Sequence, residues 1–365
     1  MTETKKEYEY WLARIRHLPN QKKYLLHTHM KSAERVYYIE ETEIRKLTFL
    51  NEKERNTIMQ AQKEKNIKIA YEKLEEKGIH FITCFMDAYP SKLKEIADFP
   101  YALYVKGSLP DETKKHAAIV GARRCTPYGE KYALEFGKML AEYGVEIISG
   151  LARGIDGMGQ RGALLGKGKT FAVLGSGVDV CYPKEHMGLY VDILEQGGGI
   201  LSEQPPGTPP LSIHFPMRNR IISGMSDTVL VIEARKRSGS LITADMALEQ
   251  GRDIYALPGP VNSGLSEGCN QLIRQGAGIL LSPEILLEEI GIHAVPGNKN
   301  SDKNKKMLES PENMVYSCVG LYPKSISQLL EETRLESEEL LQRLVSLELQ
   351  GFIREISKNY YIKIK

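Results

Sequence analysis

The spacing of apolar residues changes twice along the chain. Residues 5–18, 21–30 and 51–77 carry apolar side chains at helical intervals, with Lys and Glu between them. From about residue 76 to 292, short β-branched runs alternate with amphipathic helical patterns. These runs predict eight strands, at 80–86, 102–106, 117–121, 145–149, 170–174, 199–202, 228–233 and 253–257. Apolar strands that alternate with amphipathic helices indicate an α/β fold, a mostly parallel sheet with helices on both faces.

The last segment has a different pattern. Residues 314–319, 325–332 and 337–350 predict three helices, and residues 352–355 and 360–364 predict a terminal hairpin, which together suggest a winged-helix domain. Residues 297–306 contain no apolar residue and are typical of a linker. We therefore predict a helical domain at 1–75, an α/β domain at 76–292, a flexible linker at 293–309 and a winged helix at 310–365.

Composition narrows the class of protein without naming a function. The chain of 365 residues is 42% hydrophobic and 26% charged, as in ordinary globular proteins. Its 49 basic and 47 acidic residues leave a net charge of +2, so any basic surface must be local. The five cysteines are far apart, without zinc-site spacing, and no apolar run is long enough for a membrane helix. We expect a soluble cytoplasmic protein without a metal site, a cofactor or a membrane partner.

Four predicted strand-to-helix junctions are rich in glycine and carry cations or hydroxyls. At the first, the strand ends at Gly121, Arg123 and Arg124 follow, and Thr126 is suited to cap the next helix. Free amides at that helix start could receive a phosphate, with Arg123 adding charge. The alternative is a tight turn with two surface arginines.

The second and third junctions have the same character. The second combines Ser149, Gly150 and Arg153 with Asp156, which either orients the arginine or caps a helix. The third junction contains two glycines and a lysine, namely Gly175, Gly177 and Lys184. It lacks the third glycine of a dinucleotide fingerprint, and Lys184 is either a phosphate contact or a solvated side chain.

The fourth junction offers hydroxyls at a predicted helix start. The residues that could form an anion nest there are Ser238, Gly239, Ser240 and Thr243. Just upstream in the chain, Arg218, Asn219 and Arg220 follow Phe215, a candidate for base stacking or for core packing. The two arginines could instead form salt bridges with acids such as Glu203 or Glu233.

The four junctions are most informative together. In parallel sheets, ligands bind beyond the carboxyl ends of the strands, and these ends carry phosphate-binding groups. We find no nucleophile–base pair among them and assign no catalytic residue. A groove for a polyanion fits this pattern better than an active site.

The middle of the chain closely resembles the DNA-processing protein A (DprA/Smf) family. The similarity rests on ten strings in family order, among them VGARRCTPYG (120–129), SGLARGID (149–156), RGAL (161–164), AVLGSGVD (172–179), YPKE (182–185), FPMRNRIIS (215–223) and SGSLITA (238–244). The resemblance implies an extended Rossmann-like domain, a SAM-like N-terminal helical domain and no enzymatic turnover. It further implies binding of single-stranded DNA in natural transformation, loading of RecA, displacement of single-strand-binding protein, and homodimers formed through the Rossmann-like domain.

The resemblance also implies a DNA pocket centred on Arg123 and on a lysine that we align to Lys184, lined by Arg218, Arg220 and the 238–244 loop. The chain departs from the family in carrying Gln160 where most members have histidine, and in lacking a glycine turn at 18–23. The segment 331–350 contains six glutamates and two arginines, so we expect its winged helix to contact protein or to tune the dimer rather than to bind DNA.

Two other functions remain open from the sequence. One is a Rossmann-like nucleotide hydrolase or transferase of the phosphoribohydrolase type, although the P-G-G-x-G-T string of those enzymes is absent. The other is a protein scaffold in which the glycine turns are only structural. Nucleotide turnover would favour the first, and DNA binding that ignores Arg123→Glu would favour the second.

Overall fold

The computed structural model describes residues 6–292, 310–320 and 323–364. The N-terminal region is helical, with α1 (Lys6–Arg14), α2 (Asn20–Met30), α3 (Ala33–Tyr37), α4 (Glu41–Lys46), α5 (Glu52–Ala61) and α6 (Ile67–Glu76). The single helix predicted at 51–77 is wrong, because α5 and α6 are separate helices with a break at residues 62–66. The helices α3 and α4 were not predicted.

The described residues of the middle region form a nine-stranded sheet. Its strands are β1 (His80–Thr83), β2 (Ala102–Gly107), β3 (His116–Val120), β4 (Glu146–Ser149), β5 (Thr170–Leu174), β6 (Gly199–Ser202), β7 (Thr228–Val231), β8 (Asp253–Ala256) and β9 (Gly278–Ile279). The order across the sheet is β1-β2-β6-β5-β4-β3-β7-β8-β9. The strands from β6 to β9 in this order pair in parallel, whereas β1 and β2 are antiparallel to their neighbours. The predicted mostly parallel sheet is confirmed, and β9 is the strand that the prediction missed.

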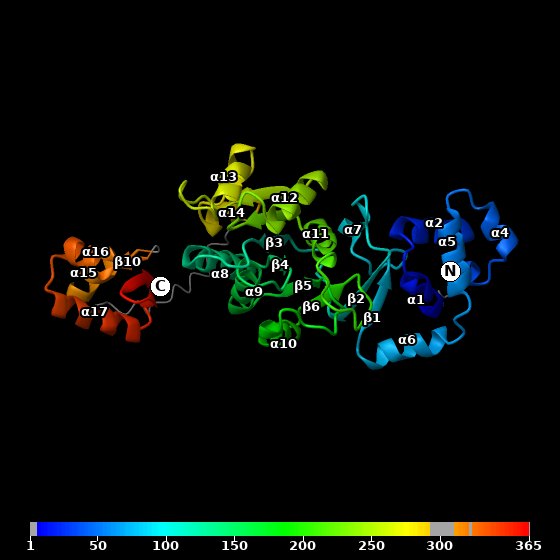
Figure 1. Cartoon of the computed structure of the whole chain (residues 1–365), viewed down its shortest axis with the longest axis horizontal. Coiled ribbons are helices and arrows are strands. Elements are labelled where there is room, and N and C mark those ends of the chain that lie inside the picture. Colours follow the sequence, from blue (N-terminus) through cyan, green and yellow to red (C-terminus); the bar gives the residue numbers. More distant parts are fainter. Residues whose placement is uncertain (1–5, 293–309, 321–322, 365) are drawn as a thin grey trace.

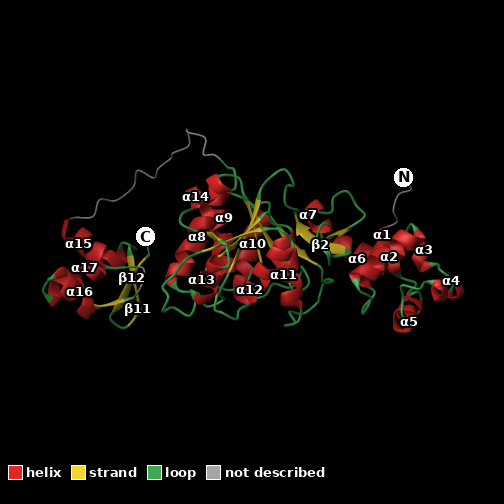
Figure 2. Cartoon of the chain, turned by 90° about the horizontal axis from the view of Figure 1, so that it is seen from above, coloured by secondary structure: helices red, strands yellow, loops and turns green. Residues whose placement is uncertain are grey.

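Helices cover both faces of this sheet (Figures 1 and 2). They are α7 (Ser91–Lys94), α8 (Pro127–Glu142), α9 (Ile155–Leu165), the 3-10 turn η1 (Lys184–His186), α10 (Met187–Glu195), α11 (His214–Gly224), α12 (Gly239–Glu249), α13 (Glu267–Arg274) and α14 (Pro283–Glu289). Successive side chains of β3 point to opposite faces of the sheet. Ile119 belongs to the apolar cluster that contains Phe136 of α8, and Val120 belongs to a second apolar cluster that contains Ile222 of α11.

The second apolar cluster continues into the N-terminal helices. Trp11 and Leu12 of α1 belong to it together with Tyr101 and Tyr104 beside and within β2. The Tyr101 hydroxyl donates a hydrogen bond to Glu9 Oε2 at 2.5 Å, deep in the same contact. The N-terminal helices are therefore packed onto the antiparallel edge of the sheet through a shared core (Figure 1).

The C-terminal region forms a small domain with its own apolar core. It comprises α15 (Ser310–Cys318), β10 (Lys324–Ser325), α16 (Ile326–Thr333), α17 (Ser337–Leu349), β11 (Ile353–Ser357) and β12 (Tyr360–Lys363). The three strands form one sheet in the order β10-β12-β11, around a core that includes Leu329, Leu344 and Ile353. Three helices with a terminal hairpin confirm the predicted winged helix, and β10 was missed. The predicted linker, 293–309, lies outside the described residues.

Candidate functional site

A cavity of about 780 Å³ lies where the direction of chain progression across the sheet reverses. From β3 the chain proceeds to β4, β5 and β6 on one side, whereas β7, β8 and β9 extend the sheet on the other. The crevice beyond the carboxyl ends of β3 and β7 is the position where ligands bind in open α/β sheets. Three predicted segments meet there: the turn after β3, the start of α11 and the start of α12. The predicted residues that line this cavity are Gly121, Arg123, Arg218, Asn219, Ser238, Gly239, Ser240 and Thr243. We call it the arginine pocket.

Positive charge dominates the lining of the arginine pocket. Arg123, Arg124, Arg218 and Arg235 line it, and Asp156 is the carboxylate among them. Within the described residues, Arg123, Arg124 and Arg235 are exposed and form no ion pair. The pocket therefore presents guanidinium groups whose charge is not neutralised locally, which suits a phosphate-bearing ligand.

Aromatic rings support one of these arginines. The Arg123 guanidinium lies over the Phe215 ring, 5.4 Å from its centroid, and Phe215 lies 5.6 Å from the ring of Tyr182. A cation above an aromatic face is attracted by the ring quadrupole. Phe215 is half-buried rather than part of the core, so it holds Arg123 and still borders the cavity.

Arg218 is a buried cation with unused hydrogen-bonding capacity. Only 6% of the residue is exposed, its Nη1 donates to the Val173 carbonyl, and its Nε is buried without a partner in the described structure. Burial lowers the pKa of Arg218 to about 10; Asp156 opposes this shift and Arg123 adds to it. Burial likewise raises the pKa of Asp156, against the effect of Arg218. A buried guanidinium that is only partly satisfied is costly unless an anion completes its contacts.

Gly150 is required by this arrangement. A Cβ at position 150 would lie 2.3 Å from Arg218 Nη1 and 2.6 Å from Asp156 Oδ2. Because there is no Cβ, the Gly150 amide can approach Asp156 and donate to Oδ2 at 3.1 Å. The glycine after β4 thus leaves the space that a Cβ would fill to the buried cation and the buried carboxylate.

The start of α12 supplies the neutral part of the pocket. Ser238 is the N-cap residue in extended conformation, and its side chain makes no capping hydrogen bond. Its Oγ instead lies 2.8 Å from Oγ of Ser240. A Cβ added to Gly239 would meet no atom within 4 Å, so the space in front of this helix start is open. Hydroxyls and the first amides of an 11-residue helix are oriented into a cationic cavity.

The predicted cap at the start of α8 is confirmed, since the Thr126 hydroxyl accepts a hydrogen bond from the Gly129 amide at 3.2 Å, but a carboxylate lies where a phosphate was expected. The Thr126 amide donates to Glu233 Oε2 at 2.8 Å, and its hydroxyl donates to Glu233 Oε1 at 2.5 Å. Glu233 follows β7 and is buried, and this burial raises its pKa. Its carboxylate thus occupies the helix start where the sequence suggested a phosphate. We leave Thr126 out of the proposed contacts.

Arg220 lies outside the pocket. Its Nη2 donates to Glu203 at 2.8 Å and its Nε lies 3.2 Å from Asp98 Oδ2, on the side of α11 that faces the N-terminal region. The salt-bridge alternative, with Glu203, is the observed one, and Arg220 does not line the arginine pocket. Asn219, between the two arginines, donates to the Gly239 carbonyl at 3.3 Å and joins α11 to α12.

The remaining predicted residues surround the pocket at different depths. Arg153 borders a small adjoining hollow with Arg123, but it is exposed and paired with Glu185. Lys184 is exposed at the start of η1 and lines none of the hollows described in the structure. Three others serve the scaffold: Ser149 is buried and donates to the Ile119 carbonyl, Gly175 packs against Phe215, and Gly177 packs against residues 205–207.

Gln160 is also structural. It is fully buried, accepts a hydrogen bond from the Leu151 amide at 3.2 Å and donates to the Phe171 carbonyl at 3.2 Å. It therefore orders the turn after β4 from behind the pocket. The lining residue that sequence reasoning missed is Arg235, and its position after β7 was the available signal. Glu233 was considered only as a salt-bridge partner of the α11 arginines, and its contact with Thr126 was not predicted.

Comparisons with known proteins identify the family. Residues 80–291 match the model for DNA recombination-mediator protein A, and residues 300–357 match the DprA winged helix domain. The chain belongs to the DNA-processing protein A (DprA/Smf) family. Among the relatives, Protein Smf of Escherichia coli is 41% identical over 83% of this chain and 84% of its own length. The DNA processing protein DprA of Streptococcus pneumoniae is 45% identical over 56% of this chain and 71% of its own length.

Two solved structures of the family are similar to this chain. The X-ray structure of Streptococcus pneumoniae DprA superposes with a TM-score of 0.68 and 34% identity, covering 80% of this chain and all of that one. Helicobacter pylori DprA superposes with a TM-score of 0.51 and 28% identity, covering 58% of this chain and 95% of that one. The latter structure is described as showing a unique single-stranded DNA binding mode of that protein.

Two further findings bear on the class of site. Among the described residues, no three His, Cys, Asp or Glu side chains are grouped as a metal site would require. In the same residues, no helix is both long and apolar enough to cross a bilayer.

Proposed function

We propose that the arginine pocket binds the phosphate backbone of single-stranded DNA. The observation that carries this proposal is Arg218, a buried guanidinium with an unpartnered Nε, beside the unpaired Arg123 in an open cavity. Phosphate oxygens would supply the missing acceptors of both groups. The free start of α12 adds donors, and Phe215 and Tyr182 offer ring faces to unstacked bases. The single-stranded DNA binding described for Helicobacter pylori DprA supports this assignment.

The chemistry of the lining favours binding over turnover. Asp156 is the acid in the described lining, and it is buried against Gly150 and Arg218 rather than facing a nucleophile. The nucleotide hydrolase or transferase alternative would find hydroxyls in Ser238 and Ser240, but no His, Lys or Glu side chain lines the described pocket to serve as their base. Membership in a family described as recombination mediators agrees with a binding role without catalysis.

The direct test is a fluorescence anisotropy titration of labelled poly-dT, from about 50 to 200 mM salt, with matched duplex DNA alongside. We expect tight single-strand binding by the wild type and a loss of at least about tenfold for Arg123→Glu. Arg161→Glu is the control, because Arg161 is exposed on α9 and does not line the pocket. Equal binding by Arg123→Glu and wild type would refute the proposed site and direct attention to nucleotide screens.

We further propose that the bound strand is handed to RecA in the cytoplasm, as a step of natural transformation, with single-strand-binding protein displaced. This partner assignment comes from the family resemblance, and the cationic pocket supports its DNA half. The assay is RecA nucleation on DNA covered by single-strand-binding protein. We expect the wild-type protein to shorten the lag before RecA nucleation. The Arg123→Glu variant should leave this lag as long as it is without the protein. A wild type without any effect on the lag would refute the assignment.

We also propose a homodimer formed through the β9 end of the sheet. Apolar side chains are exposed there: Ile279 in β9 is 44% exposed, Leu281 is 63% exposed and Ile285 in α14 is 39% exposed. An open edge strand with exposed apolar residues is a natural pairing surface. Light scattering should report a dimer for wild type and a monomer for Leu281→Glu. Leu165→Glu, at a position 60% exposed on α9, is the control that should stay dimeric.

A further inference from the structure

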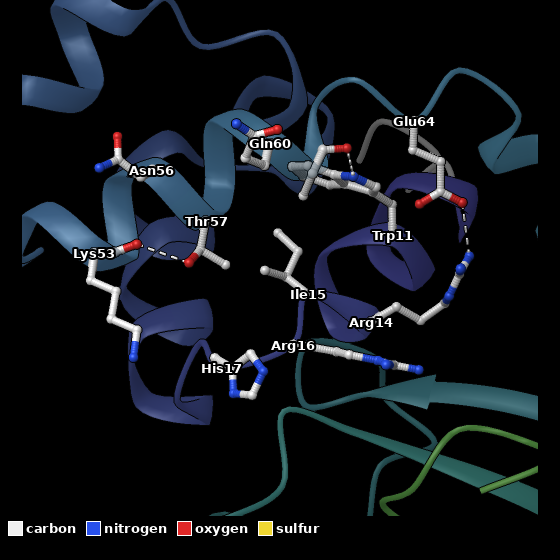
Figure 3. A pocket seen from close by; sticks show the side chains of 11 residues that line it. Trp11, Arg14, Ile15, Arg16, His17, Lys53, Asn56, Thr57, Gln60 and Glu64 are labelled. Carbon is white, nitrogen blue, oxygen red and sulfur yellow. Dashed lines mark hydrogen bonds and ion pairs between the residues drawn. The ribbon is translucent and has the colours of Figure 1, made fainter.

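Two more hollows extend from the arginine pocket toward the N-terminal end of the molecule. A hollow of about 940 Å³ lies between residues 13–23 and residues 203–217, at the junction of the two regions. A groove of about 810 Å³ lies on the N-terminal region, between the end of α1 and α5 (Figure 3). We call them the junction hollow and the N-terminal groove.

The three hollows are adjacent. Residues 209–217 form the wall between the arginine pocket and the junction hollow: Ser212 and Phe215 line the first, whereas Leu211 and Ile213 line the second. Residues 14–17 line both the junction hollow and the N-terminal groove. Each boundary is a single stretch of chain, so one extended polymer could cross both.

The N-terminal groove carries unneutralised positive charge on Arg16 and Lys53. Arg16, His17 and Lys53 are exposed along it and, within the described residues, form no ion pair. Arg14 differs, since its Nη1 lies 3.1 Å from Glu64 Oε1. Figure 3 shows Lys53 on α5 at the left of the groove, and Arg16 and His17 on the segment after α1 in the lower part of the view. His17 adopts a left-handed backbone with φ of 62°, an uncommon conformation that places it at an exposed turn.

Uncharged groups complete the groove. The side chains of Asn56 and Gln60 are exposed on α5 and line it, and the buried Trp11 and Ile15 form its apolar floor. Cations with amide groups above an apolar floor are the mixture that tracks a sugar–phosphate backbone without reading its sequence.

The junction hollow joins the two cationic sites along a wall of exposed apolar side chains, although Lys23 and residues 14–17 line it as well. Its exposed apolar residues are Leu211 at 48%, Ile213 at 66% and Met217 at 44%. The acids that line it, Glu203 and Asp98, both pair with Arg220, so their charge is offset. Exposed apolar side chains beside a neutralised wall suit bases and sugars better than phosphates.

We propose that the N-terminal groove is a second contact site for the same DNA strand, which leaves the arginine pocket over residues 211–217 and reaches Arg16, His17 and Lys53. This inference rests on the single-stranded DNA binding proposed above and extends it. It assigns to the N-terminal region a contact with backbone phosphates that does not need the glycine turn missing at residues 18–23. The second site predicts that affinity continues to rise with strand length beyond what the arginine pocket can hold.

The test compares poly-dT strands from about 6 to about 40 nucleotides. The variant is the full chain with Arg16→Glu and Lys53→Glu. Each phosphate contact contributes about 0.7 to the slope of log K against log salt concentration on a single strand. Loss of two such contacts at about 0.15 M salt should therefore lower the affinity for long strands by roughly tenfold. Short strands, held by the arginine pocket, should bind like wild type. The control carries Lys63→Glu and Lys65→Glu, which make the same charge change in the same region at exposed residues outside the groove.

The outcomes separate the two proposals. If Arg123→Glu weakens all lengths and the Arg16/Lys53 variant weakens only long strands, both proposals stand. If the Arg16/Lys53 variant binds long strands like wild type, or loses equally at every length, the second site is refuted while the arginine pocket stands. If Arg123→Glu binds every length like wild type, the proposed function fails, and the second site fails with it.

Discussion

Gly150→Ala is the substitution that tests most directly how the arginine pocket is built. The new Cβ would lie 2.3 Å and 2.6 Å from the two terminal nitrogens of Arg218, and 2.6 Å from Oδ2 of Asp156. Non-bonded atoms are comfortable at about 3.5 Å, so each contact overlaps by about 1 Å. Arg218 is only 6% exposed and Asp156 only 7%, so neither side chain can move into solvent without leaving its site.

The magnitude follows from two costs. Overpacking a dense site costs about 1–3 kcal/mol, and disturbing a hydrogen bond of a charged group costs about 1.5–3 kcal/mol. A free-energy loss of roughly 4 kcal/mol should lower the melting temperature by about 5 °C in a chain of this size. Because Arg218 is displaced from the cavity, single-strand affinity should fall by about tenfold at a temperature where the variant remains folded.

The matched control is Gly188→Ala. Gly188 lies in α10, an added Cβ would meet nothing within 4 Å, and its φ is not in the left-handed region. Alanine there should be neutral or stabilise the helix by up to about 1 kcal/mol. Thermal unfolding by circular dichroism and anisotropy titration measure both quantities. A Gly150→Ala protein with the melting temperature and the DNA affinity of wild type would refute the close packing of Arg218, Gly150 and Asp156.

Three other substitutions test separate parts of the structure. Gly239→Leu should leave the stability of the protein unchanged, because the space before α12 is open. The leucine side chain should fill this space and weaken single-strand binding in the anisotropy assay. Unchanged binding would mean that no ligand approaches the start of α12. Burial lowers the pKa of Lys23 to about 8, so the unfolded chain holds this proton more tightly, and stability should rise from about pH 8 toward the ordinary lysine pKa. Denaturant unfolding should show that Lys23→Met removes this rise; persistence of the rise would contradict the assignment. Removal of residues 293–365 should leave the affinity for duplex DNA unchanged in the anisotropy titration. The reason is that α17 exposes Leu341, Val345 and Leu349 among glutamates, which phosphates would repel. A marked loss of duplex affinity would show that the winged helix binds DNA.

Local pattern predicted the sheet well because its central strands, such as β5 and β6, are buried on both faces. The strands Thr170–Leu174 and Gly199–Ser202 have the predicted bounds, since continuous apolar runs between glycines leave little choice. The N-terminal helices were predicted less well. The start of α5 is marked in the sequence, because Asn51 and Glu54 form a capping box. The break at residues 62–66 is not marked by any change in the apolar pattern, and α3, with five residues, is too short to give a helical pattern.

The candidate site was predicted as a set of strand ends, but not as a set of contacts. Gly121, Arg123 and Ser238 come together because the carboxyl ends of β3 and β7 are neighbours, which the motif positions indicated. The occupation of the α8 start by Glu233 could not be predicted from the sequence. It depends on which of the acids near β7 points inward, and that choice is made by tertiary packing.

The two arginines of α11 show why residues so close in sequence have different roles. Positions 218 and 220 are two residues apart, so a helix directs their side chains about 200° from each other. Arg218 enters the arginine pocket, whereas Arg220 pairs with Glu203, which also accepts a hydrogen bond from Asn20 at 2.5 Å. One helix therefore carries both the buried cation of the proposed DNA site and the polar contact to the N-terminal region.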